Sequence, residues 1–176
     1  MLITHQQWNL FVIIQFLIEI IIFIAIYYHY IYLRYQHKQF IYYTLFYFYV
    51  IGILFVTILP LDFQYFEFGH WNHIYNHNFL FPFRDVFYHY RGAIYNVILN
   101  ILLFIPFGLL FPLIYHYSFI KTHFIGLSMI ISIEIIQLLL SLFCIGFRTF
   151  DITDIMMNDL GLCLGYLIYK ILKGNV

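Results

Sequence analysis

The sequence predicts an all-α protein, a polytopic bundle of about five transmembrane helices, because it contains that many apolar runs of the roughly 20 residues that a membrane-spanning helix needs. Hydrophobic residues make up 64% of the 176 residues, and charged residues make up only 9%. A soluble domain of this length does not need so much apolar surface, so lipid is the expected solvent. The formal net charge is zero, which argues against a nucleic-acid partner.

Each expected span lies in a run with few or no charged residues. The N-terminal stretch MLITHQQWN contains no Lys or Arg, and the apolar run after it is too long for a signal peptide, so we expect an uncleaved first span. The expected spans are about residues 9–33, the uncharged run between Lys38 and Asp62, and residues 92–120, 122–147 and 153–172. Residues 1–40 then hold the first span with its loop, and residues 41–172 form a second domain with the other four.

The distribution of Lys and Arg between the loops predicts the orientation. On one side, basic residues stand without acidic neighbours: Arg34, Lys38, Lys121, Lys170 and Lys173. On the other side, basic residues are accompanied by acidic ones: Arg84, Arg91 and Arg148. We therefore expect the N-terminus to face outside and the C-terminus to face the cytoplasm.

Residues 61–93 form the outward-facing loop of this arrangement, and they are aromatic rather than polar, so we expect them to lie in the membrane interface. Three histidines in the loop follow helical spacing: His70, His73 and His77. A structural zinc site needs a fourth ligand. Because both cysteines, Cys144 and Cys163, lie in apolar runs and are interpreted as buried thiols, no metal and no cofactor are expected.

Polar side chains recur at helical spacing within the last three expected spans. They are Asn96 and Asn100 in the third, Glu134, Gln137 and Ser141 in the fourth, and Asp151, Asp154 and Asn158 at the start of the fifth. At a rise of about 1.5 Å per residue, Asn100 lies about 10 Å and Glu134 about 18 Å below the outer ends of their helices. The sequence therefore predicts a polar zone open to the outer leaflet, with Arg148, Asp151 and Asp154 at its rim.

Function and packing compete as explanations for these residues. An ionisable residue inside a membrane suggests a function by default. A glutamine could form the same hydrogen bonds between helices without the charge of Glu134, so packing alone explains Glu134 less well. Asn96, Asn100 and Gln137 are equally well explained as hydrogen-bonding groups between helices, each contributing about 1 kcal/mol. Glu19, in the first expected span, has only Gln15 near it at helical spacing, and its role is left open.

A proline and two glycines in the same helices are expected to shape the backbone near these polar side chains. Pro106 cannot donate a hydrogen bond to the Leu102 carbonyl and is interpreted as a kink. Gly161 and Gly165 are spaced to allow close approach of another helix. Asp159 projects away from the Asp154 face, and its role is left open.

Three segments, taken in order, resemble the VanZ-like family of bacterial integral membrane proteins: NVILNILLFIPFGLLFP (residues 96–112), IEIIQLLL (133–140) and RTFDITDIMMNDLGLCLGY (148–166). The family pattern is filled by Asn100, Phe104, Pro106, Phe107, Gly108, Glu134, Gln137, Arg148, Asp151, Asp154, Asn158, Gly161 and Gly165. The resemblance covers about residues 41–172, and Asp159 departs from the small or hydroxyl residue expected at its position.

The resemblance implies a multi-pass protein of the bacterial cytoplasmic membrane with a role in the cell envelope. It also implies a link to resistance against the lipoglycopeptide-type antibiotic teicoplanin, but it supplies no reaction. The structural residues it points to are Pro106, Gly108, Gly161 and Gly165.

Two functions from different classes remain open. In the first, the protein binds or modulates a membrane lipid, a lipid-linked envelope molecule or the lipid tail of an antibiotic, and the ligand-binding residues are Arg148, Asn100, Gln137 and Asn158. In the second, a membrane-embedded enzyme acts on a lipid-linked phosphate or acyl substrate, with catalytic candidates Glu134, Asp151 and Asp154 and with Arg148 stabilising the transition state. We favour binding, because the sequence offers no activated nucleophile.

Overall fold

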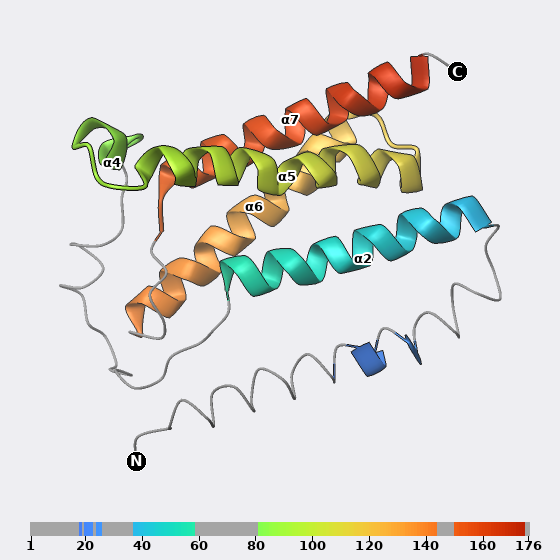
Figure 1. Cartoon of the computed structure of the whole chain (residues 1–176), viewed down its shortest axis with the longest axis horizontal. Coiled ribbons are helices and arrows are strands. Elements are labelled where there is room, and N and C mark those ends of the chain that lie inside the picture. The colour runs from blue at the N-terminus through green and yellow to red at the C-terminus, as the bar shows by residue number, and fades with distance from the viewer. Residues whose placement is uncertain are drawn as a thin grey trace. The chain divides into compact units, whose positions relative to one another are not determined.

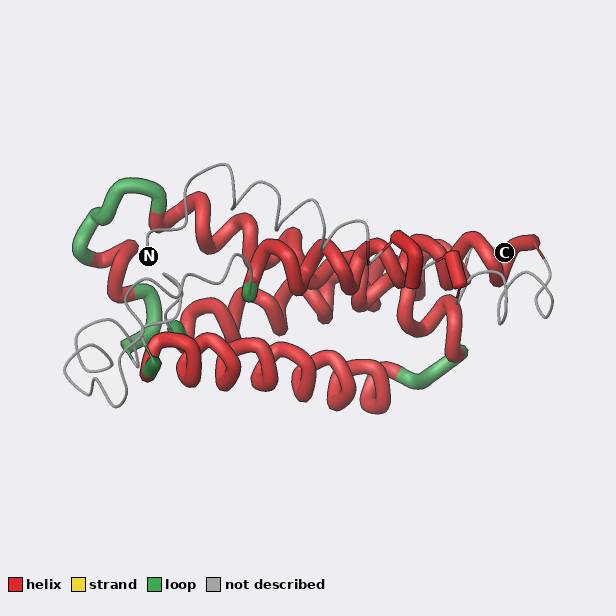
Figure 2. Tube along the Cα trace, turned by 90° about the horizontal axis from the view of Figure 1, so that it is seen from below, coloured by secondary structure: helices red, strands yellow, loops and turns green. Residues whose placement is uncertain are grey.

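The computed structural model describes residues 18, 20–22, 24–25, 37–58, 81–143 and 150–174. Within these residues, every secondary-structure element longer than one residue is a helix (Figure 2). This confirms the all-α class. The chain divides into two compact units, residues 1–45 and 46–176. The first expected span, about residues 9–33, lies mostly outside the described residues, so the number of spans and the orientation of the termini stay predictions.

Four of the described helices are long and apolar enough to cross a membrane, which supports a multi-pass membrane protein. Their bounds agree with the expected spans within a few residues, and a short helix, α4, precedes the second of them (Figure 1). The helices are α2 (His37–Thr57), α4 (Arg84–Phe87), α5 (Ala93–Tyr115), α6 (Phe119–Leu142) and α7 (Ile152–Gly174). The largest differences are at the ends of α5 and α6, which stop at Tyr115 and Leu142 rather than near residues 120 and 147.

The closest helix pair is α5 and α7, which run side by side in the same direction (Figure 1). A Cβ atom added at Gly161 would collide with the carbonyl oxygen of Ile101, and one added at Gly165 would collide with that of Ile105. A Cβ atom at Gly108 would in turn collide with the backbone of α7. Small residues at these three positions allow the two backbones to touch, as transmembrane helices with this spacing commonly do.

An aromatic core fills the space between residues 46–57 of α2 and helices α5, α6 and α7. Phe104 and Phe107 of α5 are almost fully buried there, and the Phe107 ring stacks on Phe111 with centroids 4.8 Å apart. Phe46 of α2 packs against the same rings. The regular spacing of Phe along α5 thus builds one continuous apolar layer.

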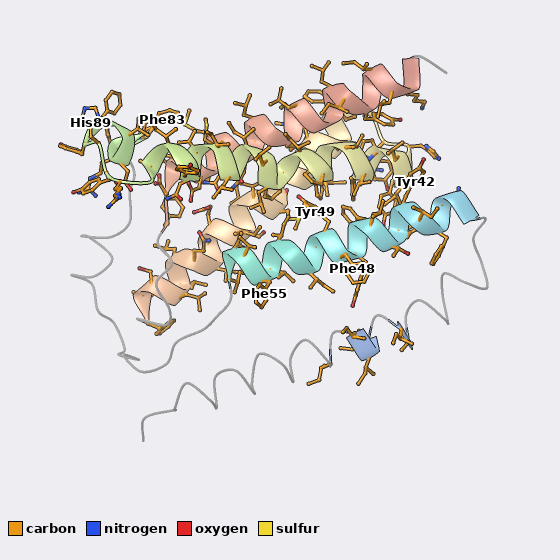
Figure 3. All side chains as sticks on the ribbon, viewed as in Figure 1. Tyr42, Phe48, Tyr49, Phe55, Phe83 and His89 are labelled. Atoms are coloured by element: carbon orange, nitrogen blue, oxygen red, sulfur yellow. The ribbon has the colours of Figure 1, made fainter. Side chains whose placement is uncertain are left out.

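Pro106, which we expect to kink its helix, lies within α5 close to a hydrogen bond donated from α2. The Tyr49 hydroxyl donates to the carbonyl oxygen of Leu103 at 2.9 Å, and Figure 3 shows the Tyr49 side chain directed from α2 toward α5. The expected free carbonyl was that of Leu102, one residue earlier. The Leu103 carbonyl lies four residues before Phe107, which keeps its N–H, so this bond ties α2 to α5 and does not satisfy the Leu102 carbonyl that Pro106 leaves without a donor.

Candidate functional site

The start of α7 joins three parts of the chain. Asp151 caps the helix, because its Oδ1 accepts a hydrogen bond from the Thr153 backbone N–H at 2.7 Å. The backbone N–H of Asp151 donates to Oε2 of Glu134 on α6 at 3.2 Å. The hydroxyl oxygen of Thr153 accepts from the backbone N–H of Phe83, which precedes α4, at 2.8 Å. Phe83 and His89 lie at either side of this short helix (Figure 3).

One turn further along α7, Asp154 is tied to α5. Nδ2 of Asn100 donates a short hydrogen bond to Oδ1 of Asp154. Glu134 is only 2% exposed. The structure therefore brings together Glu134, Asp151, Asp154 and Asn100, four of the residues that spacing and resemblance select.

A small pocket of about 90 Å³ opens between the α4 segment, α5 and the start of α7. Its polar lining consists of Asp85, Asn96, Asp151, Thr153 and Asp154, and apolar side chains of the α4–α5 segment complete it. Three of these residues carry carboxyl groups, so the pocket attracts cationic groups. Glu134 does not belong to the lining and instead supports Asp151 from the α6 side.

Several groups act on the pKa of Asp151, which lies just before the membrane-spanning segment of α7. Partial burial raises its pKa most, and the nearby Asp85 carboxylate raises it further. The backbone N–H and the hydroxyl of Thr153 lower it, as does the charge of Arg84. The net result is a raised pKa, which reflects first the cost of burying the charged carboxylate and second the repulsion from Asp85, and a bound cation would oppose both effects.

Gln137 and Asn158 are buried away from the pocket lining. Gln137, 6% exposed, donates through Nε2 to the carbonyl oxygen of Thr57 at the end of α2, at 2.9 Å. Asn158 is 4% exposed, and its Oδ1 forms no hydrogen bond with any part of the chain that the structure describes. Gln137 and Asn158, two members of the predicted polar zone, are therefore buried but do not line the acidic pocket. Arg148, Glu19 and the histidines of residues 70–77 lie outside the described residues.

Two groupings were not predicted from the sequence. Asp85 joins the pocket because the α4 segment folds back on α7, which no local pattern indicates. On the other side of α7, Nδ1 of His123 on α6 lies 3.4 Å from Oδ1 of Asp159 and 3.9 Å from Sγ of Cys163. The i, i+4 spacing of Asp159 and Cys163 is the only part of this cluster that the sequence indicates. The contribution of His123 depends on how α6 crosses α7, which the sequence does not show.

Comparison with known proteins agrees with the sequence motifs. The VanZ/LLP1 family model matches residues 46–173, which is most of the chain. Searches of curated proteins and of solved structures gave no match. The chain belongs to the VanZ/LLP1 family.

Proposed function

We propose that this VanZ/LLP1 protein binds a lipid or lipid-linked molecule of the cell envelope, and that the acidic pocket receives a positively charged part of its head group. The observation that carries the proposal is the convergence of Asp85, Asp151 and Asp154 on one pocket at the end of the α5–α7 pair. Carboxylates held together at a membrane interface lower their repulsion by binding an ammonium group or a metal cation.

The size of the pocket limits what enters it. A pocket of about 90 Å³ compares with about 30 Å³ for a water molecule in the liquid and with about 300–1,000 Å³ for sites that enclose a drug-sized ligand. A primary ammonium group fits, and a whole lipid or antibiotic does not. The apolar part of the ligand would therefore lie along the outside of the helices.

The surroundings of the pocket suit such a ligand. Large aromatic side chains are exposed beside it, among them Phe87, Tyr88 and Tyr95, and aromatic rings of this kind favour the level of lipid head groups. Arg148, three residues before Asp151 in the sequence, is the candidate partner for a phosphate of the same ligand. A zwitterionic head group would satisfy both charges. Protection against a teicoplanin-type antibiotic would follow if the protein holds the lipid or the antibiotic's lipid tail away from its target.

The test is mass spectrometry of lipids retained by the purified protein after reconstitution in equal amounts of phosphatidylethanolamine and phosphatidylglycerol. The wild type should retain the amine-bearing lipid selectively, and Asp85→Asn should lose that selectivity. Asp159→Asn, which changes a carboxylate of α7 outside the pocket, is the matched control and should behave as the wild type. Equal selectivity in the wild type and Asp85→Asn would exclude the pocket as the head-group site.

Arg148→Ala tests the phosphate contact separately, because lipid retention equal to that of the wild type would remove Arg148 from the site.

A second function, catalysis on a lipid-linked phosphate or acyl substrate, is favoured by one observation. Glu134 accepts the backbone N–H of Asp151, and Asp154 stands one turn further along α7, so three carboxyl groups lie near one another and could act as general acid or base or hold a divalent cation. The test is to incubate the protein with a bacterial lipid extract and to search for new products. If the double variant Asp151→Asn/Asp154→Asn generates the same products as the wild type, these two residues are not catalytic.

A further inference from the structure

We propose a second site on this protein, a binding site for a thiophilic divalent transition metal such as Zn²⁺, formed by His123 of α6 with Asp159 and Cys163 of α7. Each of the three side chains offers one ligand atom, and these atoms all lie within 4.8 Å of one another. Asp159 and Cys163 are four residues apart and therefore share one face of α7. The site is separate from the acidic pocket, whose lining contains none of these residues.

Two of the three distances between the ligand atoms are close to those of a tetrahedral site. Zinc bonds of about 2.0–2.1 Å to nitrogen, about 2.0–2.2 Å to oxygen and about 2.3 Å to sulfur place a nitrogen and an oxygen ligand about 3.4 Å apart, and a nitrogen and a sulfur ligand about 3.6 Å apart, at the tetrahedral angle. The structure has 3.4 Å between Nδ1 of His123 and Oδ1 of Asp159, and 3.9 Å between Nδ1 and Sγ of Cys163. Binding a metal would need only small side-chain adjustments.

An ion pair between His123 and Asp159 explains the geometry less well. A hydrogen bond between a charged imidazole and a carboxylate is normally about 2.7–2.9 Å long, and the observed separation is 3.4 Å. Oδ1 of Asp159 is shielded from the surroundings, yet among the described residues it has no hydrogen-bond donor. A shielded carboxylate oxygen that faces an imidazole nitrogen and a thiol is suited to a cation.

The chemical types of the ligand atoms indicate the class of metal, and their charges balance that of the metal. A thiolate with an imidazole selects zinc or a similar soft to borderline ion over Mg²⁺ or Ca²⁺, which prefer oxygen ligands. A carboxylate, a thiolate and a neutral imidazole neutralise a divalent ion completely, which removes the cost of leaving Asp159 charged within an apolar helix. The side chains of His123 and Asp159 are 26% and 32% exposed, so the three protein ligands leave the fourth tetrahedral position open. The bound metal would cross-link α6 to α7.

The experiment uses the full chain in detergent, purified without a histidine tag, stripped with a chelator and titrated with Zn²⁺ against a chromophoric competitor. The wild type should bind about one Zn²⁺ per chain, as expected for a single tetrahedral site. Cys163→Ser and Asp159→Asn should each bind roughly tenfold more weakly or worse. Cys144→Ser, which removes the other cysteine, and Asp85→Asn, which changes the acidic pocket, should bind as the wild type does.

A spectroscopic readout keeps the test decisive if a variant fails to fold. Co²⁺ bound to the wild type should give a thiolate-to-cobalt charge-transfer absorption, and Cys163→Ser should lose it. The proposal is overturned if the wild type takes up no stoichiometric Zn²⁺, or if its Co²⁺ complex lacks the thiolate absorption. It is also overturned if Cys163→Ser and Asp159→Asn bind Zn²⁺ as tightly as the wild type.

Discussion

At the scale of single residues, Asp151 connects the helix cap, the acidic pocket and the support from α6. Its side chain caps α7, its backbone N–H is held by Glu134, and its carboxyl group lines the pocket beside Asp85. The sequence predicted Asp151, Asp154 and Asn158 on one helix face from their spacing. Spacing along one helix does not show which other residues that face contacts. Neither the hydrogen bond from Asp151 to Glu134 nor the position of Asp85 in the pocket could therefore be predicted from spacing.

The raised pKa of Asp151 makes stability depend on pH in the opposite direction to that of a salt-bridged aspartate. The folded state holds this proton more tightly than the unfolded chain, whose pKa is about 3.9. The stabilisation is therefore fully present below that value and is lost as pH rises toward the raised pKa. Asp151→Asn keeps a good helix cap and removes the titration. In thermal unfolding, the wild type should be more stable relative to this variant at about pH 3.5 than at about pH 7. A difference that stays constant or grows with pH would contradict the prediction.

Glu134 is predicted to act through Asp151 rather than on the ligand. Glutamine keeps an oxygen that accepts the Asp151 N–H, so Glu134→Gln should change the unfolding free energy by less than about 1 kcal/mol and should retain lipid as the wild type does. Glu134→Ala leaves that partly buried N–H without its acceptor and should cost about 1–3 kcal/mol. Thermal unfolding and lipid retention measure the two effects. If Glu134→Gln folds normally but no longer retains lipid, the charge of Glu134 takes part in binding.

At the scale of helices, the glycines of α7 are predicted to determine how closely α5 and α7 pack. A methyl group at Gly161 or Gly165 would meet a backbone carbonyl of α5, which cannot move aside as a side chain can, so Gly161→Ala and Gly165→Ala should each cost about 1–3 kcal/mol. Gly52→Ala is the matched control, because a Cβ at Gly52 meets nothing within 4 Å, and it should be neutral or stabilise by up to about 1 kcal/mol. The unfolding free energies of the three variants are measured in detergent, and equal values for all three would contradict this explanation.

The helices themselves were predictable, whereas their partners were not. Apolar runs bounded by charged residues located the described spans within a few residues, because the thickness of the bilayer sets the length of a helix. Gly161 and Gly165 predicted that some helix approaches closely, but not that it would be α5. Gln137 was placed in the same polar zone as Glu134 because they share a helix face, yet it donates to Thr57 of α2. Such pairings depend on how the helices cross, which no single-helix pattern encodes.

At the scale of the whole molecule, the acidic pocket and the proposed metal site lie on different parts of α7. The pocket is at the first turn of α7, beside the α4 segment, whereas Cys163 lies near the middle of the helix. A ligand in the pocket therefore contacts α5 and the α4 segment as well as α7, whereas a metal contacts α6 and α7. The two proposals can fail independently, since Asp85→Asn changes one site and Cys163→Ser changes the other.

The orientation of the chain decides which leaflet the pocket serves, and it can be measured directly. The asymmetry of Lys and Arg predicts that the α4 segment faces outside and that the turn between α5 and α6 faces the cytoplasm. Tyr90 and Ser118 are exposed in these two places, whereas Thr122 is buried and unsuitable for labelling. In a background without Cys144 and Cys163, an impermeant thiol reagent added to intact cells should label Tyr90→Cys. It should label Ser118→Cys only after the membrane is opened. The reverse pattern would place the acidic pocket on the cytoplasmic side, and its ligand would then be a lipid of the inner leaflet.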